Sequence, residues 1–71
     1  MIEVQPVASE WFSWSIITGD TFAARATLRA HHCEWLPKSR TWQTVDHGSL
    51  VRSLRAAGHE VSVRPVVRWV G

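Results

Sequence analysis

Hydrophobic and polar residues alternate along several segments of the chain, and this period-two pattern predicts strands. The first segment is residues 10–18, EWFSWSIIT, in which large apolar side chains of types favoured in strands take every second position: Phe12, Trp14 and Ile16. Gly19 interrupts the pattern. The alanine-rich segment 21–31 that follows predicts a helix, which Asp20 or Thr21 can cap.

Residues 33–45, CEWLPKSRTWQTV, predict a hairpin whose connection is residues 37–40. If residues 36 and 41 pair, Trp35 lies directly opposite Trp42 on one face of the hairpin. We expect the two indoles to form a cross-strand packing pair. The alternative, that one of them also stacks on a base, depends on how exposed they are.

A second helix is predicted from the cap residue Asp46 to Gly58, which suits the C′ position. Four apolar residues in this segment share one helical face: Leu50, Val51, Leu54 and Ala57. From Glu60 the chain alternates again, and four residues are expected on one face of a last strand: Val61, Val63, Val67 and Trp69. Pro65 indicates an edge position, a bulge or an interruption. The segment IEVQPV near the N-terminus can add a further strand.

The order β-α-β-β-α-β is typical of the split βαβ, or ferredoxin-like, arrangement. We therefore predict one α+β domain over residues 1–71, an antiparallel sheet with both helices on one face. This arrangement buries the apolar stripes and leaves the other face of the sheet open. A chain of 71 residues with five tryptophans, 45% hydrophobic, can build such a core without a disulfide or a metal.

Few residues are spaced for catalysis or for metal binding. The run HHC at 31–33 invites a metal-site interpretation, but the sequence has neither CxxC nor HxxxH spacing. Cys33 with a histidine base is a chemically possible nucleophile, but a cysteine in a strand is usually an inert core residue. The sequence also lacks a glycine-rich phosphate loop. We therefore expect a non-catalytic protein without a cofactor or metal.

The sequence also bears on where the protein works. It has no apolar run near the roughly 20 residues that span a bilayer, and residues 1–11 lack the features of a signal peptide. The single Cys33 agrees with a reducing compartment. We expect a cytoplasmic protein with no membrane partner.

Basic residues number seven arginines and one lysine, for a net charge of +2, and Asn and Tyr are absent. This composition is typical of a GC-rich genome, such as that of an actinobacterium or one of its phages, so the number of arginines alone says little. Their placement says more, because the helix bodies and the hairpin tip carry basic residues without acidic ones: Arg25, Arg29, Lys38, Arg40, Arg52 and Arg55. A fold that gathers them can contact phosphates. Ordinary solvated arginines are the alternative.

Three of the predicted elements form a pattern in the order in which they occur along the chain. The first helix begins near Phe22 and contains Leu28, and the hairpin that follows carries Trp35, Arg40 and Trp42. The second helix contains Leu50 and Leu54 and ends at Gly58. In this pattern, residues 15–64 resemble the HARP domain found beside the motor of annealing helicases and in small bacterial and phage modules. The resemblance implies a nucleic-acid ligand, DNA in particular. The chain has no ATPase motor, so the resemblance does not imply helicase activity.

The sequence therefore predicts a small module that binds the phosphate backbone of nucleic acid with little sequence specificity. The alternative is a protein-interaction module, such as a phage-encoded modulator of a host protein, with exposed Trp11 or Trp69 as anchors. An apolar patch outside the basic surface would favour this alternative.

Overall fold

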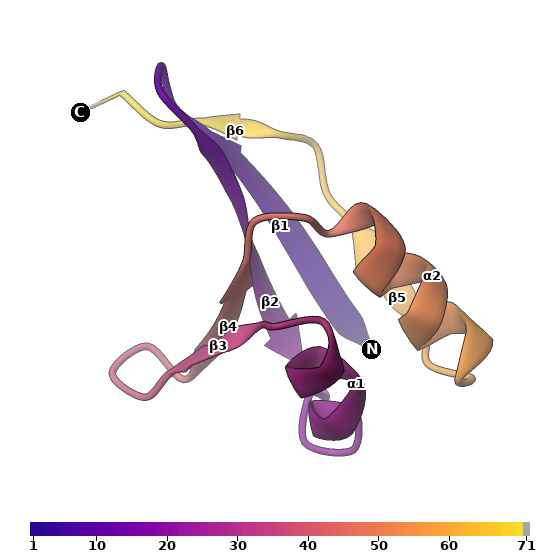
Figure 1. Ribbon diagram of the computed structural model, residues 1–71. Helices are drawn as coiled ribbons and strands as arrows, with labels where there is room; N and C mark the ends of the chain where they lie inside the picture. Colours follow the sequence, from indigo (N-terminus) through magenta and orange to yellow (C-terminus); the bar gives the residue numbers. More distant parts are fainter. Residues whose placement is uncertain (71) are drawn as a thin grey trace.

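The structure is a computed structural model that describes residues 1–70, in which two helices cover one face of a six-stranded sheet (Figure 1). The α+β class and the placement of both helices on one face are confirmed. In chain order the elements are β1 (Ile2–Ala8), β2 (Ser13–Gly19), α1 (Arg25–Ala30), β3 (Glu34–Leu36), β4 (Thr41–Thr44), α2 (Gly48–Ala56), β5 (Val61–Val63) and β6 (Val67–Arg68).

The sheet is mixed, so the prediction of a wholly antiparallel sheet is wrong in this respect. Its strand order is β3-β4-β2-β1-β5, and β6 also pairs with β1. The β1–β2, β2–β4 and β3–β4 pairs are antiparallel, whereas β5 and β6 lie parallel to β1. The cause is the N-terminal segment, which forms the additional strand foreseen as an option. It occupies the place beside β2 that the last strand takes in the split βαβ pattern, and the last strand pairs with β1 instead.

Apolar side chains from both helices fill the space against the sheet. Leu28 of α1 and Leu50 and Leu54 of α2 are fully buried, and they belong to one cluster with Ile2, Val4, Ile17, Ala24, Trp42 and Val51. The helical spacings of Ala24 with Leu28 and of Leu50, Val51 and Leu54 are thus confirmed. Ala57 is exposed, because α2 ends before it.

Helix α1 is shorter than predicted and begins at Arg25. No side chain caps its first turn. Asp20, one of the expected caps, instead lies 3.2 Å from the N-terminal amine, and Thr21 contributes its carbonyl oxygen, which accepts the N–H of Ala24 at 3.1 Å. Asp46 does support the start of α2, since its Oδ1 accepts the N–H of Gly48 at 3.1 Å.

The apolar stripe predicted for β2 faces away from the helices. Ser15 and Ile17 are buried on the helix side, so the alternation of the strand directs Trp14 and Ile16 to the opposite face. The register explains this choice, because Ile17 pairs with Val4 of β1 and with Trp42 of β4, both of which lie in the core.

The last strand changes face partway along its length. Val63 pairs with Val4 and Val67 pairs with Val7, so residues 64–66 lie opposite residues 5 and 6. One additional residue on one strand is a bulge, and it reverses which side chains face the core. The prediction that Val61, Val63, Val67 and Trp69 share one face is therefore wrong. Pro65, at which an edge position, a bulge or an interruption is expected, is one of the residues between the two pairings.

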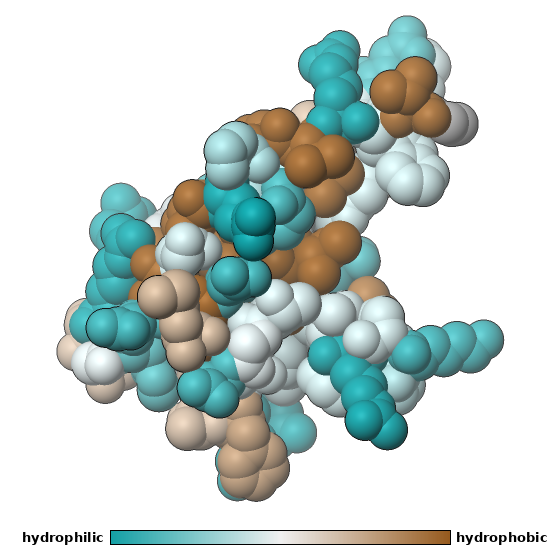
Figure 2. Space-filling model, turned by 180° about the vertical axis from the view of Figure 1, so that it is seen from behind, coloured by the Kyte–Doolittle hydropathy of each residue, from teal (hydrophilic) through white to brown (hydrophobic). Residues whose placement is uncertain are grey.

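The bulge helps to produce an apolar area on the face of the sheet that the helices leave open. Viewed from behind, Figure 2 shows hydrophobic residues gathered from the centre of this face toward the end that carries β6 and the connection between β1 and β2.

Candidate functional site

A groove lies between α1 and the β3–β4 hairpin. We call it the α1 groove; it has a volume of about 270 Å³ and is lined by Thr21, Phe22, Arg25, Arg29, Trp35 and Trp42. None of these six residues is acidic. The acidic neighbour Glu34 points to the opposite face of the hairpin, because it precedes Trp35 in the same strand.

The two arginines of the α1 groove stand one helical turn apart on the same side of α1. The guanidinium carbon of Arg25 lies 4.0 Å from the centroid of the Phe22 ring, and its Nη1 donates to the Phe22 carbonyl oxygen at 2.8 Å. Within residues 1–70, ion pairs join Met1 to Asp20 and Arg64 to Glu3. Neither pair neutralises the charge of the α1 groove.

Trp35 and Trp42 pair across the hairpin as predicted. Their ring centroids are 5.4 Å apart and their planes are inclined by 58°. Trp42 is only 6% exposed, whereas Trp35 is 44% exposed. The pair therefore has one core member and one member with an open face.

The six predicted basic residues fall in three places. Arg25 and Arg29 line the α1 groove, and Lys38 and Arg40 are exposed in the loop of the β3–β4 hairpin.

Arg52 and Arg55 lie on α2 outside the α1 groove. His31 at the end of α1 bonds Ser53 at 2.8 Å, which fixes the flank of α2 that faces α1. Arg55 lies on the other flank and donates to the carbonyl oxygen of Val61 at 3.0 Å. The structure therefore does not join the α2 arginines to those of α1.

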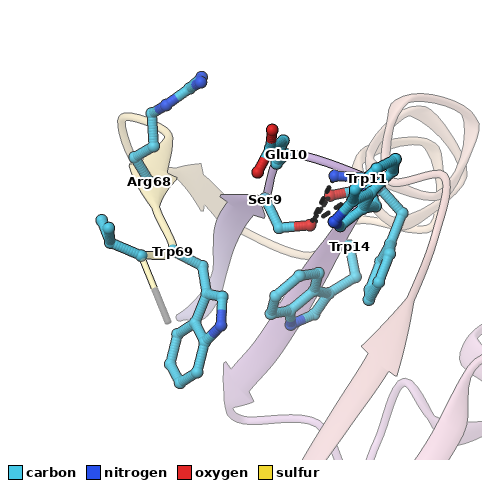
Figure 3. Close-up of a pocket in the computed structure, with 8 residues that line it drawn as sticks. Ser9, Glu10, Trp11, Trp14, Arg68 and Trp69 are labelled. Carbon is cyan, nitrogen blue, oxygen red and sulfur yellow. Dashed lines mark hydrogen bonds between the residues drawn. The ribbon is translucent and has the colours of Figure 1, made fainter.

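A second cavity, of about 450 Å³, lies where the connection between β1 and β2 meets the C-terminal segment (Figure 3). We call it the aromatic pocket; it is lined by Ser9, Glu10, Trp11, Phe12, Trp14, Arg68, Trp69 and Val70. The Trp14 ring lies 5.2 Å from that of Phe12 and 6.5 Å from that of Trp69, centroid to centroid. Trp11 is 85% exposed and Trp69 is 58% exposed.

The connection that carries Trp11 is held by Ser9. The Ser9 hydroxyl accepts the backbone N–H groups of Trp11 at 3.3 Å and of Phe12 at 3.1 Å, and it donates to the Phe12 carbonyl oxygen (Figure 3). The two predicted anchors, Trp11 and Trp69, thus line one cavity although they are far apart in the sequence.

Sequence reasoning missed three aromatic side chains that line these cavities. Phe22 stands outside the apolar stripe of α1, a signal that was compatible with exposure. Phe12 and Trp14 had no such signal, since a stripe of large apolar residues in a strand normally predicts the core.

Cys33, which the sequence offers as a chemically possible nucleophile, is partly buried and packs against the core. Burial raises the pKa of the Cys33 thiol, and its hydrogen bond with Thr44 offsets this effect only in part. His31 and His47 each bond a serine hydroxyl at 2.8 Å, and the partner of His47 is the buried Ser15. Within residues 1–70, no three histidine, cysteine or acidic side chains are grouped to hold a metal ion.

Comparisons with known proteins identify no relative: no family model matches the sequence, no curated protein matches it, and no solved structure matches the fold. None of the helices described for residues 1–70 has the length and apolar character needed to cross a membrane.

Proposed function

We propose that this protein is a small non-catalytic module that binds the phosphate backbone of nucleic acid through the α1 groove. The observation that carries the proposal is the pair Arg25 and Arg29, which share one groove without an acidic residue to neutralise them. Two like charges one helical turn apart cost the helix about 0.2–0.5 kcal/mol. An anionic ligand removes that cost and gains charge-assisted hydrogen bonds.

The β3–β4 hairpin, which forms one side of the α1 groove, carries two further cations in its loop, and we include them in the proposed surface. Arg40 has a φ of 55°, a left-handed conformation that glycine adopts more easily than arginine. An arginine at such a position keeps a cation at the hairpin tip at a conformational cost, which supports a role in binding. Lys38 adds a second cation to the same exposed loop.

The arginines of α2 take no part in this surface. Arg52 is exposed away from the core, and Arg55 lies on the flank of α2 that faces β5. Of the six basic residues considered from the sequence, we therefore propose four as phosphate contacts: Arg25, Arg29, Lys38 and Arg40.

Contacts to phosphate carry no sequence information, so the proposed binding has little sequence specificity. The chemistry requires no cofactor. DNA is the ligand suggested by the HARP-like sequence pattern. We propose that the protein works in the cytoplasm, or in the host cytoplasm if a phage encodes it.

Fluorescence anisotropy with labelled single-stranded and duplex oligonucleotides at several salt concentrations tests the proposal. Because binding releases counterions, the logarithm of the association constant should fall with that of the salt concentration, by about 0.9 per phosphate contact for duplex and about 0.7 for single strands. Electrostatic attraction is strongest at low salt, so an absence of binding there would contradict the proposal.

The aromatic pocket favours a second candidate function, a protein-interaction module. Trp11, Phe12 and Trp69 are exposed together in this pocket, and tryptophans that fill a cavity on a partner commonly dominate the energy of an interface. A host protein is the partner class that we propose for it. Affinity for that partner should change little with salt and should fall on Trp11→Ala or Trp69→Ala substitution. If the affinity for the partner is unchanged by both substitutions, the aromatic pocket is not the binding site for that protein.

A further inference from the structure

The α1 groove offers aromatic faces as well as positive charge. Phe22 is 77% exposed, and the guanidinium of Arg25 covers its ring at 4.0 Å. On the hairpin side, Trp35 keeps an open face while its indole packs against Trp42. Cations and flat apolar surfaces therefore line the same cavity.

The environment of Trp35 fixes its position before any ligand binds. Its backbone is paired with β4 directly opposite Trp42, and Trp42 is buried in the core. A side chain that is already ordered loses little conformational entropy on binding. Trp35 is therefore a preformed platform for a planar group.

We infer that the α1 groove binds single-stranded nucleic acid by stacking an unpaired base on Trp35, while Arg25 and Arg29 contact the flanking phosphates. The inference rests on the proposed function and names the form of nucleic acid that the groove takes. A base presents a flat π face and its backbone presents anions, which matches the two kinds of surface in the groove.

Duplex nucleic acid does not fit this arrangement. A paired base inside a helix is already covered on both faces by its neighbours, so its face cannot reach an indole unless the base is unstacked. Duplex can use only the arginines. The aromatic pocket is a poorer match for the same ligand, because Glu10 lines it and offsets the charge of Arg68, the one basic residue there.

The test compares a single-stranded oligothymidylate with an abasic oligomer of the same length and charge, both labelled for anisotropy at fixed salt. The wild-type protein should bind the oligomer with bases roughly 5- to 150-fold more tightly, the range expected from one stacked base. Trp35→Ala should abolish most of this preference. Trp35→Phe retains an aromatic face and should keep most of it.

The outcomes separate the inference from the proposed function. Equal, salt-dependent binding of both oligomers would overturn base stacking and leave phosphate binding intact. Binding of neither oligomer at low salt would overturn the proposed function and the inference with it. If Trp35→Ala fails to fold, equal binding of the two oligomers by the wild-type protein still overturns the inference.

Discussion

Trp35 and Trp42 occupy equivalent positions in one hairpin, but their surroundings give them different roles. Trp42 belongs to the core cluster, whereas Trp35 keeps an open face in the α1 groove. We predict that Trp42→Ala lowers the free energy of unfolding by ~3–5 kcal/mol, because it leaves a large cavity in a small core. Trp35→Ala should lower it less, since part of that ring already contacts water. Urea titrations of both variants measure the difference, and an equal loss would show that Trp35 is also a core residue.

Cys33 provides a prediction about reactivity. Burial raises the pKa of its thiol, so the reactive thiolate is scarcer in the folded protein than in the unfolded chain at any pH below that pKa. Labelling with a thiol reagent at pH 8 should therefore be slower for the native protein than for the protein in urea, and the native rate should rise as the pH increases. Equal rates in the native and unfolded protein at pH 8 would contradict this assignment.

At the scale of elements, both helices end in the same hydrogen-bonded motif with different residues. After α2, the backbone N–H of Gly58 donates to the carbonyl oxygen of Arg55, and the N–H of His59 donates to that of Leu54. After α1, the N–H of His32 donates to the carbonyl oxygen of Arg29, and the N–H of Cys33 donates to that of Leu28. All four distances are 3.0 Å. This is the Schellman pattern, whose C′ residue is left-handed and usually glycine. Gly58 has a φ of 92° and His32 a φ of 59°.

The comparison predicts opposite effects of two substitutions. His32→Gly should raise the free energy of unfolding by about 1 kcal/mol, because it removes the cost of a left-handed conformation from an exposed side chain. Gly58→Ala should lower it. A Cβ at Gly58 would meet no atom within 4 Å, so the effect there is conformational alone. Thermal or urea unfolding checks both signs, and destabilisation by His32→Gly would show that the histidine side chain stabilises the turn.

Arg40 combines the same backbone conformation with a proposed binding role. Arg40→Gly should stabilise the fold by about 1 kcal/mol and at the same time weaken nucleic-acid binding, because it relieves the left-handed residue and removes a cation. Unfolding and anisotropy measurements on the same preparation test both parts. Unchanged affinity would remove Arg40 from the proposed surface.

The elements also show how far the sequence could predict the structure. The Trp35–Trp42 register and the end of α2 at Gly58 follow from local rules of hairpins and caps, and both are confirmed. The faces of β2 and of the last strand do not follow from such rules. They depend on pairing with β1 and on one additional residue near Pro65, which long-range contacts decide.

On the scale of the whole molecule, the two cavities lie in different parts of a body that measures 35 × 24 × 19 Å. The α1 groove lies beside the helices, and the aromatic pocket lies where the connection between β1 and β2 meets the C-terminal segment. The arginines and both anchor tryptophans could be proposed from the sequence. Which of them lie together could not, because that depends on which flank of each helix packs against its neighbour. The two proposed functions therefore use different surfaces of the molecule.

We propose that nucleic acid binds at the α1 groove and is not attracted merely by the net charge of the protein. The most direct measurement compares two double reversals, Arg25→Glu with Arg29→Glu on α1 and Arg52→Glu with Arg55→Glu on α2. Both change the net charge equally, and each removes one hydrogen bond from an arginine to a backbone carbonyl oxygen, Arg25 to Phe22 or Arg55 to Val61, so the pair is matched except in location. Binding at the α1 groove predicts that the α1 variant loses affinity for all sequences and that its salt slope on duplex DNA flattens by about 1.8, two contacts at about 0.9 each, while the α2 variant keeps the wild-type slope. Equal losses in the two variants would contradict it.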